Sequence, residues 1–228
     1  MHTVMRTNRS STFLRLVPTL ALTLTLLVTL SACDGLPAVN ETTRVEAGET
    51  FDGDINTVNG GVFIGEGGRV QGDVITINGP IEVGDRAEVG VLQTINGPIE
   101  LKNGVTVRGG IGSVNGLVTC GAGTSIEGSI ATVNGAVALD RTAVEGTVKT
   151  RNGPVTLKAS SRVRGDIVIE AQEGDAIPAE TLFVRLEDGS VVGGSILATD
   201  SRRPVVVYLS GGSSVRGAIT GAEVRDAP

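Results

Sequence analysis

A short motif that recurs at a nearly fixed interval constrains the fold of this chain more than any other feature. The motif has four positions: Thr or Ser, then a variable residue, then Asn, then Gly. Its asparagines are spaced 19, 18, 19, 19 and 18 residues apart: Asn59, Asn78, Asn96, Asn115, Asn134 and Asn152. A period this regular is typical of repeat proteins, in which each unit buries its apolar face only against its neighbours. The sequence therefore predicts a linear array of stacked units.

Each unit contains three short stretches with strand character. Three and five residues after the Asn, apolar residues alternate with other residues, as Ile81 and Val83 do around Glu82. This period of two indicates a half-buried strand. Two further short strands follow in each repeat, and each supplies an apolar residue on one side of a glycine. In the repeat of Asn59 these residues are Val70 and Val74, on either side of Gly72. Stacking the units as parallel strands about 4.8 Å apart places like residues on like, whereas a series of hairpins gives no reason for the period.

We therefore predict an all-β fold, a right-handed parallel β-helix with a period of 18–19 residues and about nine coils. A left-handed hexapeptide helix needs a small apolar residue at every sixth position. The inward positions here recur in steps near 8, 4 and 6 or 7, which favours the right-handed form.

The N-terminus has the features of an export signal. Arg6, Arg9 and Arg15 precede an apolar run over 16–30, which is too short for a spanning helix of about 20 residues. The run ends in Leu-Ser-Ala-Cys, which resembles the bacterial lipobox. That resemblance implies cleavage before Cys33 and its acylation by fatty acids such as palmitate. The next residue, Asp34, resembles an inner-membrane retention signal, and the choice between inner and outer membrane stays open.

These features divide the chain into four parts. We expect a lipoprotein signal peptide over 1–32, a lipidated tether over 33–43, a β-solenoid domain over 44–220 and a C-terminal tail over 221–228. An acidic insertion over 170–181 interrupts the solenoid. The expected location is the bacterial cell envelope, on the periplasmic face.

The composition of the mature chain excludes several classes of function. Removing residues 1–32 leaves 19 − 3 = 16 basic residues against 25 acidic ones, a net charge of −9, and no histidine. Nucleic-acid binding normally needs a basic surface, and a Ser/His or Cys/His catalytic pair needs histidine. Cys120 occupies an inward apolar position, where a buried, inert thiol is expected. We expect no enzyme activity, no cofactor, no metal site and no nucleic-acid partner.

A row of residues between the Thr and the Asn of each repeat is the main candidate interaction site. If this segment is a straight strand, the Thr and the Asn both face inward and the residue between them faces outward. An outward apolar stripe is a candidate docking face, although β-branched residues suit any strand and a corner at the Thr would reverse the parity. The stripe comprises Val58, Ile77, Ile95, Val114, Val133 and Arg151.

Other polar features have simpler interpretations. The Asn-Gly pair predicts a corner with positive φ, with stacked Asn amides bonded along the axis. Asp54, Asp73 and Asp166 share an outward position beside another corner, where we expect solvated carboxylates. The acidic insertion is either a ligand loop or simply solvated, and its carboxylates are Glu170, Glu173, Asp175 and Glu180.

The repeats also resemble two groups of bacterial proteins. The pattern apolar, any residue, Gly, Asp and Ile or Val occurs at 51–55, 70–74 and 163–167, and it resembles the bactofilin type of polymer-forming β-helix. The Asn-Gly-any-Ile/Val pattern resembles secreted adhesin-like solenoids. These resemblances imply a structural, adhesive or self-associating module.

We therefore expect a non-enzymatic, lipid-anchored envelope scaffold. Its expected partners are the membrane through Cys33 and either a second copy or an envelope protein or polysaccharide. The alternative is a polysaccharide-binding or carbohydrate-active β-helix. Against that alternative, Trp is absent, and the mature chain keeps only four aromatic residues as sugar platforms: Phe51, Phe63, Phe183 and Tyr208.

Overall fold

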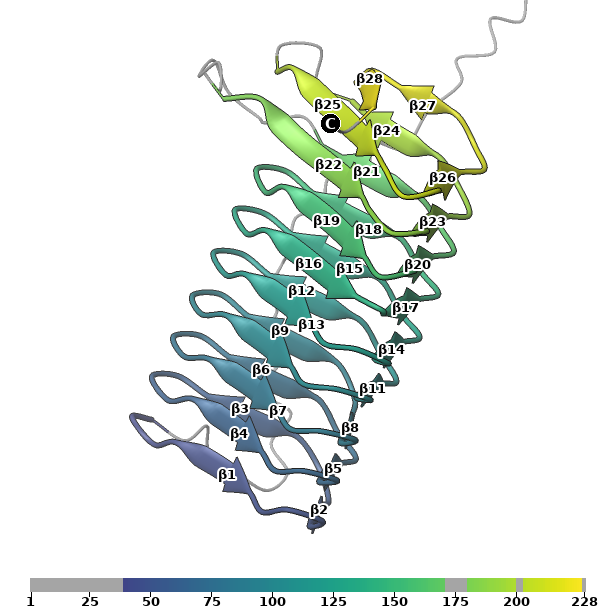
Figure 1. Ribbon diagram of the computed structural model, residues 1–228. Helices are drawn as coiled ribbons and strands as arrows, with labels where there is room; N and C mark the ends of the chain where they lie inside the picture. Colours follow the sequence, from purple (N-terminus) through teal and green to yellow (C-terminus); the bar gives the residue numbers. More distant parts are fainter. Residues whose placement is uncertain (1–38, 171–179, 200–202, 227–228) are drawn as a thin grey trace, which may run out of the picture. The chain divides into compact units, whose positions relative to one another are not determined.

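The computed structural model describes residues 39–170, 180–199 and 203–226. They belong to one compact unit, Gly35–Pro228, while a second unit, Met1–Asp34, lies outside the described residues. The described residues form three parallel sheets stacked as a β-solenoid of nine coils (Figure 1). This confirms the predicted all-β solenoid and its number of coils. Within the described ranges, no helix is long and apolar enough to span a membrane.

Every coil contributes one strand to each of three sheets. The first sheet contains β1 (Thr43–Val45), β4 (Val62–Ile64), β7 (Ile81–Val83), β10 (Ile99–Leu101), β13 (Val118–Cys120), β16 (Val137–Asp140), β19 (Val155–Lys158), β22 (Leu182–Leu186), β25 (Val205–Leu209) and β28 (Glu223–Asp226). The second contains β2 (Thr50–Phe51), β5 (Arg69–Val70), β8 (Glu88–Val89), β11 (Thr106–Val107), β14 (Ser125–Ile126), β17 (Ala143–Val144), β20 (Arg162–Val163), β23 (Val191–Val192) and β26 (Ser214–Val215). The third contains β3 (Ile55–Thr57), β6 (Val74–Thr76), β9 (Leu92–Thr94), β12 (Ile111–Ser113), β15 (Ile130–Thr132), β18 (Val148–Thr150), β21 (Ile167–Ile169), β24 (Ile196–Ala198) and β27 (Ile219–Thr220).

The core is a set of apolar ladders that run along the axis. In the first sheet Ile99 pairs with Ile81 on one side and with Val118 on the other. In the third sheet Ile130 pairs with Ile111 and Val148 in the same way. All six of these side chains are buried. The repeat period therefore produces the core directly, because each inward residue packs on its equivalents in the neighbouring coils.

The Asn-Gly corner needs glycine for a reason that differs from the prediction. A Cβ at Gly116 would lie 1.8 Å from the carbonyl oxygen of Gly97, and a Cβ at Gly135 would lie 1.8 Å from that of Gly116. The predicted positive φ at these repeat corners is wrong, because positive φ occurs instead at the turn between the first and second sheets, as at Gly67 and Gly123. Close stacking of successive backbones is what excludes a side chain here.

The asparagines of the repeat face outward, so the straight-strand alternative, which places them inward, is wrong. The chain turns after the buried Thr, whose hydroxyl bonds the corner from inside, as Thr57 Oγ1 does to the carbonyl oxygen of Gly60 at 2.7 Å. This turn carries the Asn to the surface. Each Asn Nδ2 then donates to the Oδ1 of the preceding coil's Asn at 2.7–2.8 Å, as the prediction of stacked amides required. The ladder runs from Asn40 to Asn152.

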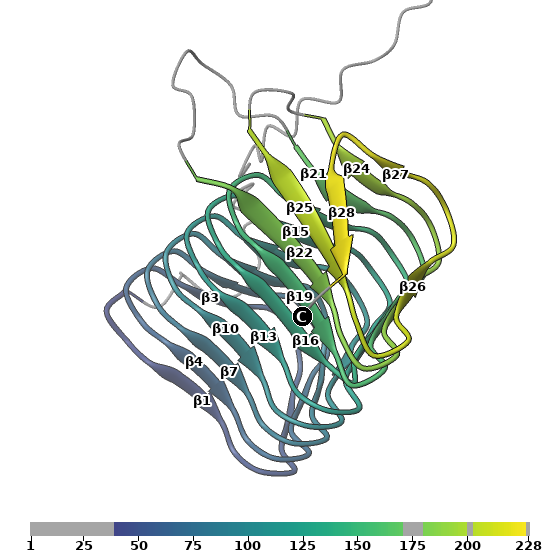
Figure 2. The same cartoon turned by 45° about the horizontal axis from the view of Figure 1, so that its top comes forward.

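The C-terminal end of the solenoid is closed by a strand from the segment predicted to be a tail. β28 pairs with β25 in parallel (Figure 2), so the apolar strand Val205–Leu209 is not an open edge. The Arg225 Nε lies 2.8 Å from the Glu223 Oε1 on this terminal strand. Charged side chains on an edge strand oppose pairing with another chain.

Candidate interaction surface

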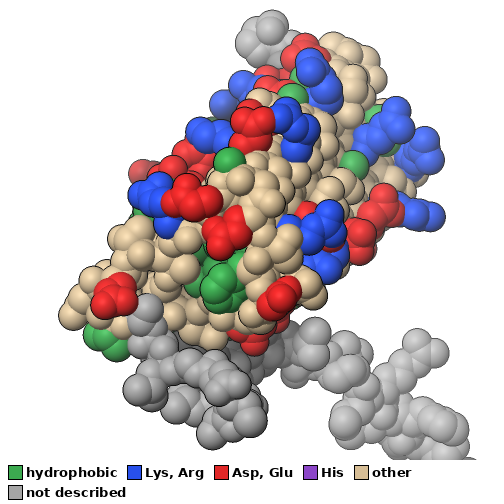
Figure 3. All heavy atoms as spheres, turned by 90° about the horizontal axis from the view of Figure 1, so that it is seen from below, with side chains coloured by type: hydrophobic (Ala, Val, Ile, Leu, Met, Phe, Trp, Pro, Cys, Tyr) green, Lys and Arg blue, Asp and Glu red, His purple; other side chains and the backbone are tan. Residues whose placement is uncertain are grey.

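The outer faces of the three sheets differ in charge. The second sheet carries the ion pair Arg69–Glu88 between coils, with an N–O distance of 2.6 Å, and the corner that follows this sheet carries Arg164–Glu145, with an N–O distance of 2.7 Å. Acidic and basic side chains are interspersed over much of the surface seen from below (Figure 3). The third sheet is different, because its central outward positions from β3 to β15 are all uncharged: Asn56, Ile75, Gln93, Gly112 and Ala131.

The predicted stripe borders this uncharged face. Its six residues, Val58 to Arg151, are each partly exposed. The backbone pairing between coils continues through them, since the Ile77 N–H donates to the carbonyl oxygen of Thr57 at 3.1 Å. The stripe lies between the inward Thr row and the outward Asn ladder.

A second apolar row lies on the other side of the Asn ladder. It consists of Pro80, Pro98, Leu117 and Ala136, and Leu117 is 46% exposed. We use the name neutral ridge for the Asn ladder from Asn59 to Asn134 with its two apolar flanks, the stripe from Val58 to Val133 and the row from Pro80 to Ala136. The neutral ridge contains hydrogen-bonding amides and apolar side chains and no charged group. Such a surface suits a protein partner better than a small charged ligand.

The neutral ridge ends in a charged cluster at Arg151. The Arg151 Nη2 lies 3.7 Å from the Glu170 Oε2, and both side chains are 24% exposed. Arg203 terminates the Asn ladder, because its Nη1 donates to the Asn152 Oδ1 at 3.0 Å. Of the predicted ligand loop, Glu170 belongs to this cluster and Glu180 is exposed. The other two loop residues, Glu173 and Asp175, lie outside the described residues.

The three corner aspartates have a structural role. Asp54 Oδ1 accepts the backbone N–H of Asp73 at 2.8 Å, and Asp73 Oδ1 accepts that of Val91 at 2.9 Å. Asp166 Oδ1 accepts the N–H of Ser195 at 2.7 Å. Each carboxylate thus caps an amide of the next coil. In the part of the chain that the structure describes, no group of three or more His, Cys, Asp or Glu side chains could hold a metal ion.

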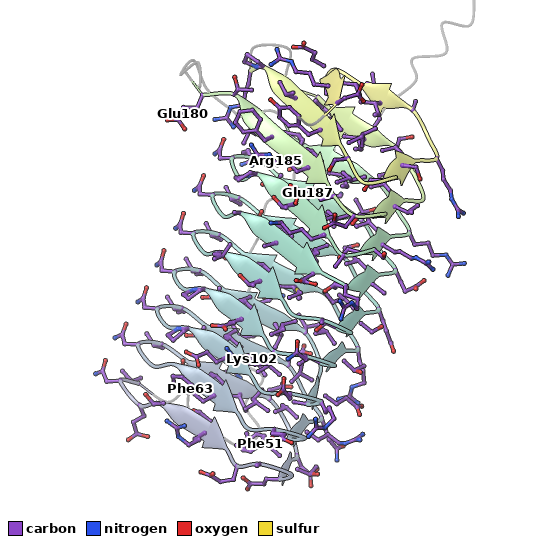
Figure 4. The ribbon with its side chains drawn as sticks, viewed as in Figure 1. Phe51, Phe63, Lys102, Glu180, Arg185 and Glu187 are labelled. Atoms are coloured by element: carbon purple, nitrogen blue, oxygen red, sulfur yellow. The ribbon has the colours of Figure 1, made fainter. Side chains whose placement is uncertain are left out.

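A shallow hollow of about 210 Å³ lies on the first sheet near the N-terminal coils. Gly65 and Gly84 line it together with Phe63 and Lys102, which Figure 4 labels. The Arg44 guanidinium carbon lies 4.9 Å from the centre of the Phe63 ring. The rim carries both signs of charge, so its electrostatics favour no single class of ligand.

Sequence reasoning missed an aromatic cluster near the C-terminal end of the first sheet. The ring centres of Phe183 and Tyr208 are 5.9 Å apart. The Arg185 guanidinium carbon lies 5.2 Å from the first ring centre and 5.5 Å from the second. These residues come together because β22 pairs in register with β25 of the next coil. The sequence showed only that both segments are apolar.

The predicted lipidation site, Cys33, lies outside the described residues. No protein-family model, no curated protein and no solved structure matches this chain.

Cys120 is buried, and burial raises the pKa of its thiol from 9.0 to about 12. At pH 8 about one thiol in ten thousand is then ionised, and only the thiolate reacts. We expect Ellman's reagent to leave Cys120 unmodified in the folded chain and to modify it at once in urea. Because the folded pKa is raised, the thiol's contribution to stability is complete below pH 9 and is lost as the pH rises toward 12. Rapid labelling of the folded chain at pH 8 would contradict this environment.

Proposed function

We propose that this protein is a non-enzymatic, lipid-anchored scaffold of the bacterial cell envelope that self-associates side by side. The observation that carries this proposal is the contrast between faces: the second sheet and the corner that follows it carry ion pairs such as Arg69–Glu88 and Arg164–Glu145, while the neutral ridge and the adjoining third sheet have no charge from β3 to β15. Charged residues are depleted at the centres of protein interfaces. The resemblance to bactofilin-type and adhesin-like solenoids supports the same role.

Lateral contact is favoured over end-to-end stacking by the chemistry of the two ends. If a second copy continued the first sheet beyond β28 in the same register, Arg225 would lie beside Arg44 of that copy, and Asp226 would lie beside Val45. Like charges directly opposite on adjacent strands are destabilising. The end-to-end assembly typical of the bactofilin type is therefore disfavoured in this chain.

The size of the uncharged surface fits a weak contact that the membrane would strengthen. Five coils at about 4.8 Å, each contributing a stretch of about seven consecutive residues at roughly 3.3 Å per residue, cover roughly 550 Å² on each partner. The total of roughly 1,100 Å² is near the lower limit of specific interfaces. Anchoring through Cys33 would confine the rods to one surface and raise their effective concentration.

Sedimentation of the chain from residue 34 onward, which contains the compact unit Gly35–Pro228, tests this proposal. We expect wild-type protein to form oligomers as its concentration rises, because the neutral ridge desolvates easily. The double substitution Ile77→Lys/Ile95→Lys should yield monomers, since it buries two charges without partners.

The matched control is Thr106→Lys/Ser125→Lys, which adds the same charges to paired outward positions of the second sheet. This variant should sediment like wild type. A wild-type monomer at every concentration, or equal loss of oligomers in both variants, would contradict lateral association through the neutral ridge.

A further inference from the structure

The first sheet carries an arginine held in an unusual setting near its C-terminal end. Arg185 on β22 is exposed and pairs across the sheet with Tyr208 on β25. Its guanidinium lies over both the Phe183 and the Tyr208 rings, with centre distances of 5.2 Å and 5.5 Å. Figure 4 shows Arg185 on the outer side of this sheet, well away from Phe63 and Lys102.

Arg185 differs from its basic neighbours because it lacks an acidic partner. The Lys158 Nζ lies 3.5 Å from the Glu187 Oε2, and the Arg225 Nε lies 2.8 Å from the Glu223 Oε1. Among the residues that the structure describes, no carboxylate forms an ion pair with Arg185. The positive charge that remains at this end of the sheet is therefore its guanidinium.

The aromatic pair prepares this guanidinium for an anion. Stacking uses the flat face of the guanidinium, so the N–H groups on its edge stay available for a carboxylate. The two rings also restrict the side chain, which reduces the rotamer entropy lost on binding.

A flat strip continues from Arg185 along the outer face of the first sheet. The residues in register below it are Thr156, Ala138 and Thr119. From Tyr208 to Thr119 the strip covers four coil spacings, about 19 Å. Beyond it, Glu100 and Glu82 occupy the same row. A negatively charged chain could therefore lie over the uncharged strip but would be repelled farther along.

We propose that this strip binds an acidic polysaccharide, with a sugar carboxylate on Arg185. The partly exposed Phe183 and Tyr208 side chains offer an apolar surface to the sugar, and the hydroxyls of Thr156 and Thr119 offer hydrogen bonds to its hydroxyl groups. A peptide is a poorer fit, because peptides bind to sheet edges or into side-chain pockets, and this strip lies on the flat face of a fully paired sheet. The site is separate from the neutral ridge and does not depend on self-association.

Calorimetric titration of the full-length chain in detergent tests the site, with polygalacturonate as the acidic probe and dextran as the neutral one. We expect wild type to bind polygalacturonate and not dextran. Arg185→Gln should weaken binding about tenfold or more, because a charge-assisted hydrogen bond is lost. The double substitution Phe183→Ala/Tyr208→Ala should weaken it similarly while Arg185 remains. Arg185→Lys should give an intermediate loss of affinity. A lysine ammonium keeps the positive charge but cannot form the two parallel hydrogen bonds that a guanidinium forms with a carboxylate.

The matched control is Arg162→Gln, which removes an exposed charge from β20 of the second sheet. It should bind like wild type, and the melting curves of Arg185→Gln and Arg162→Gln should coincide with that of wild type. Equal weakening by Arg162→Gln would show diffuse charge attraction and overturn the proposal. Absence of polygalacturonate binding, equal binding of dextran, or Arg185-dependent binding only to phosphatidylglycerol vesicles would also overturn it.

Discussion

Replacing Gly116 with alanine is expected to destabilise the solenoid by about 3 kcal/mol, at the upper end of overpacking effects. The new Cβ would lie 1.8 Å from the Gly97 carbonyl oxygen and 2.8 Å from the Ser113 Oγ. The carbonyl belongs to the backbone of the preceding coil, whose Asn96 is bonded to Asn115 in the outer ladder. The corner therefore cannot relax without separating two coils. Urea unfolding followed by circular dichroism measures the effect.

The matched control is Gly112→Ala, four residues earlier on β12. A Cβ there would meet only the Gln93 Cγ, at 3.6 Å, and Gly112 has no positive φ. This variant should be neutral or more stable by up to about 1 kcal/mol, because alanine restricts the unfolded chain. If the two variants unfold at the same urea concentration, the backbones of successive Asn-Gly corners do not approach each other closely enough to exclude a side chain.

The repeat period was sufficient to predict the solenoid, because a parallel stack is the arrangement that lets one motif serve every coil. Inward residues such as Val62 and Ile64 could be assigned from their alternation alone, and they are buried. Alternation failed at the corners. It places Asn59 on the same side as Thr57, whereas the chain turns between them and exposes the Asn. A period of two holds only while the backbone stays extended.

The surfaces could be predicted only where the period persists. The stripe was located because its positions repeat with the Asn, and the structure leaves its residues partly exposed. Phe183 and Tyr208 come after the acidic insertion that breaks the period, so their register could not be counted from the motif. Their contact depends on the pairing of β22 with β25. Likewise, β28 lacks the repeat signature and was assigned to a tail, although it pairs with β25.

In the proposed function, the two sides of the solenoid separate stability from recognition. Most inward residues of each coil are branched apolar groups, and with the buried Thr and Ser row they hold the stack together. Outward residues vary from ion pairs on the second sheet to the neutral ridge and the Arg185 strip. Substitutions on the two sides should therefore affect different measurements.

A pair of leucine substitutions makes this separation measurable. Leu101 is 1% exposed and packs in register between Val83 and Cys120. Leu101→Ala should lower the free energy of unfolding by about 2–5 kcal/mol, because it leaves a cavity in a ladder whose neighbours cannot close it. Leu117→Ala, at a side chain 46% exposed, should change it by less than about 0.5 kcal/mol.

The two variants should show the opposite order in self-association. Leu117 lies on the neutral ridge, so Leu117→Ala should weaken oligomers in sedimentation while its urea midpoint stays at the wild-type value. Folded Leu101→Ala should associate like wild type, because its side chain does not reach the surface. If Leu117→Ala leaves sedimentation unchanged, the row from Pro80 to Ala136 is not part of the contact, and the interface must be confined to the stripe and the third sheet.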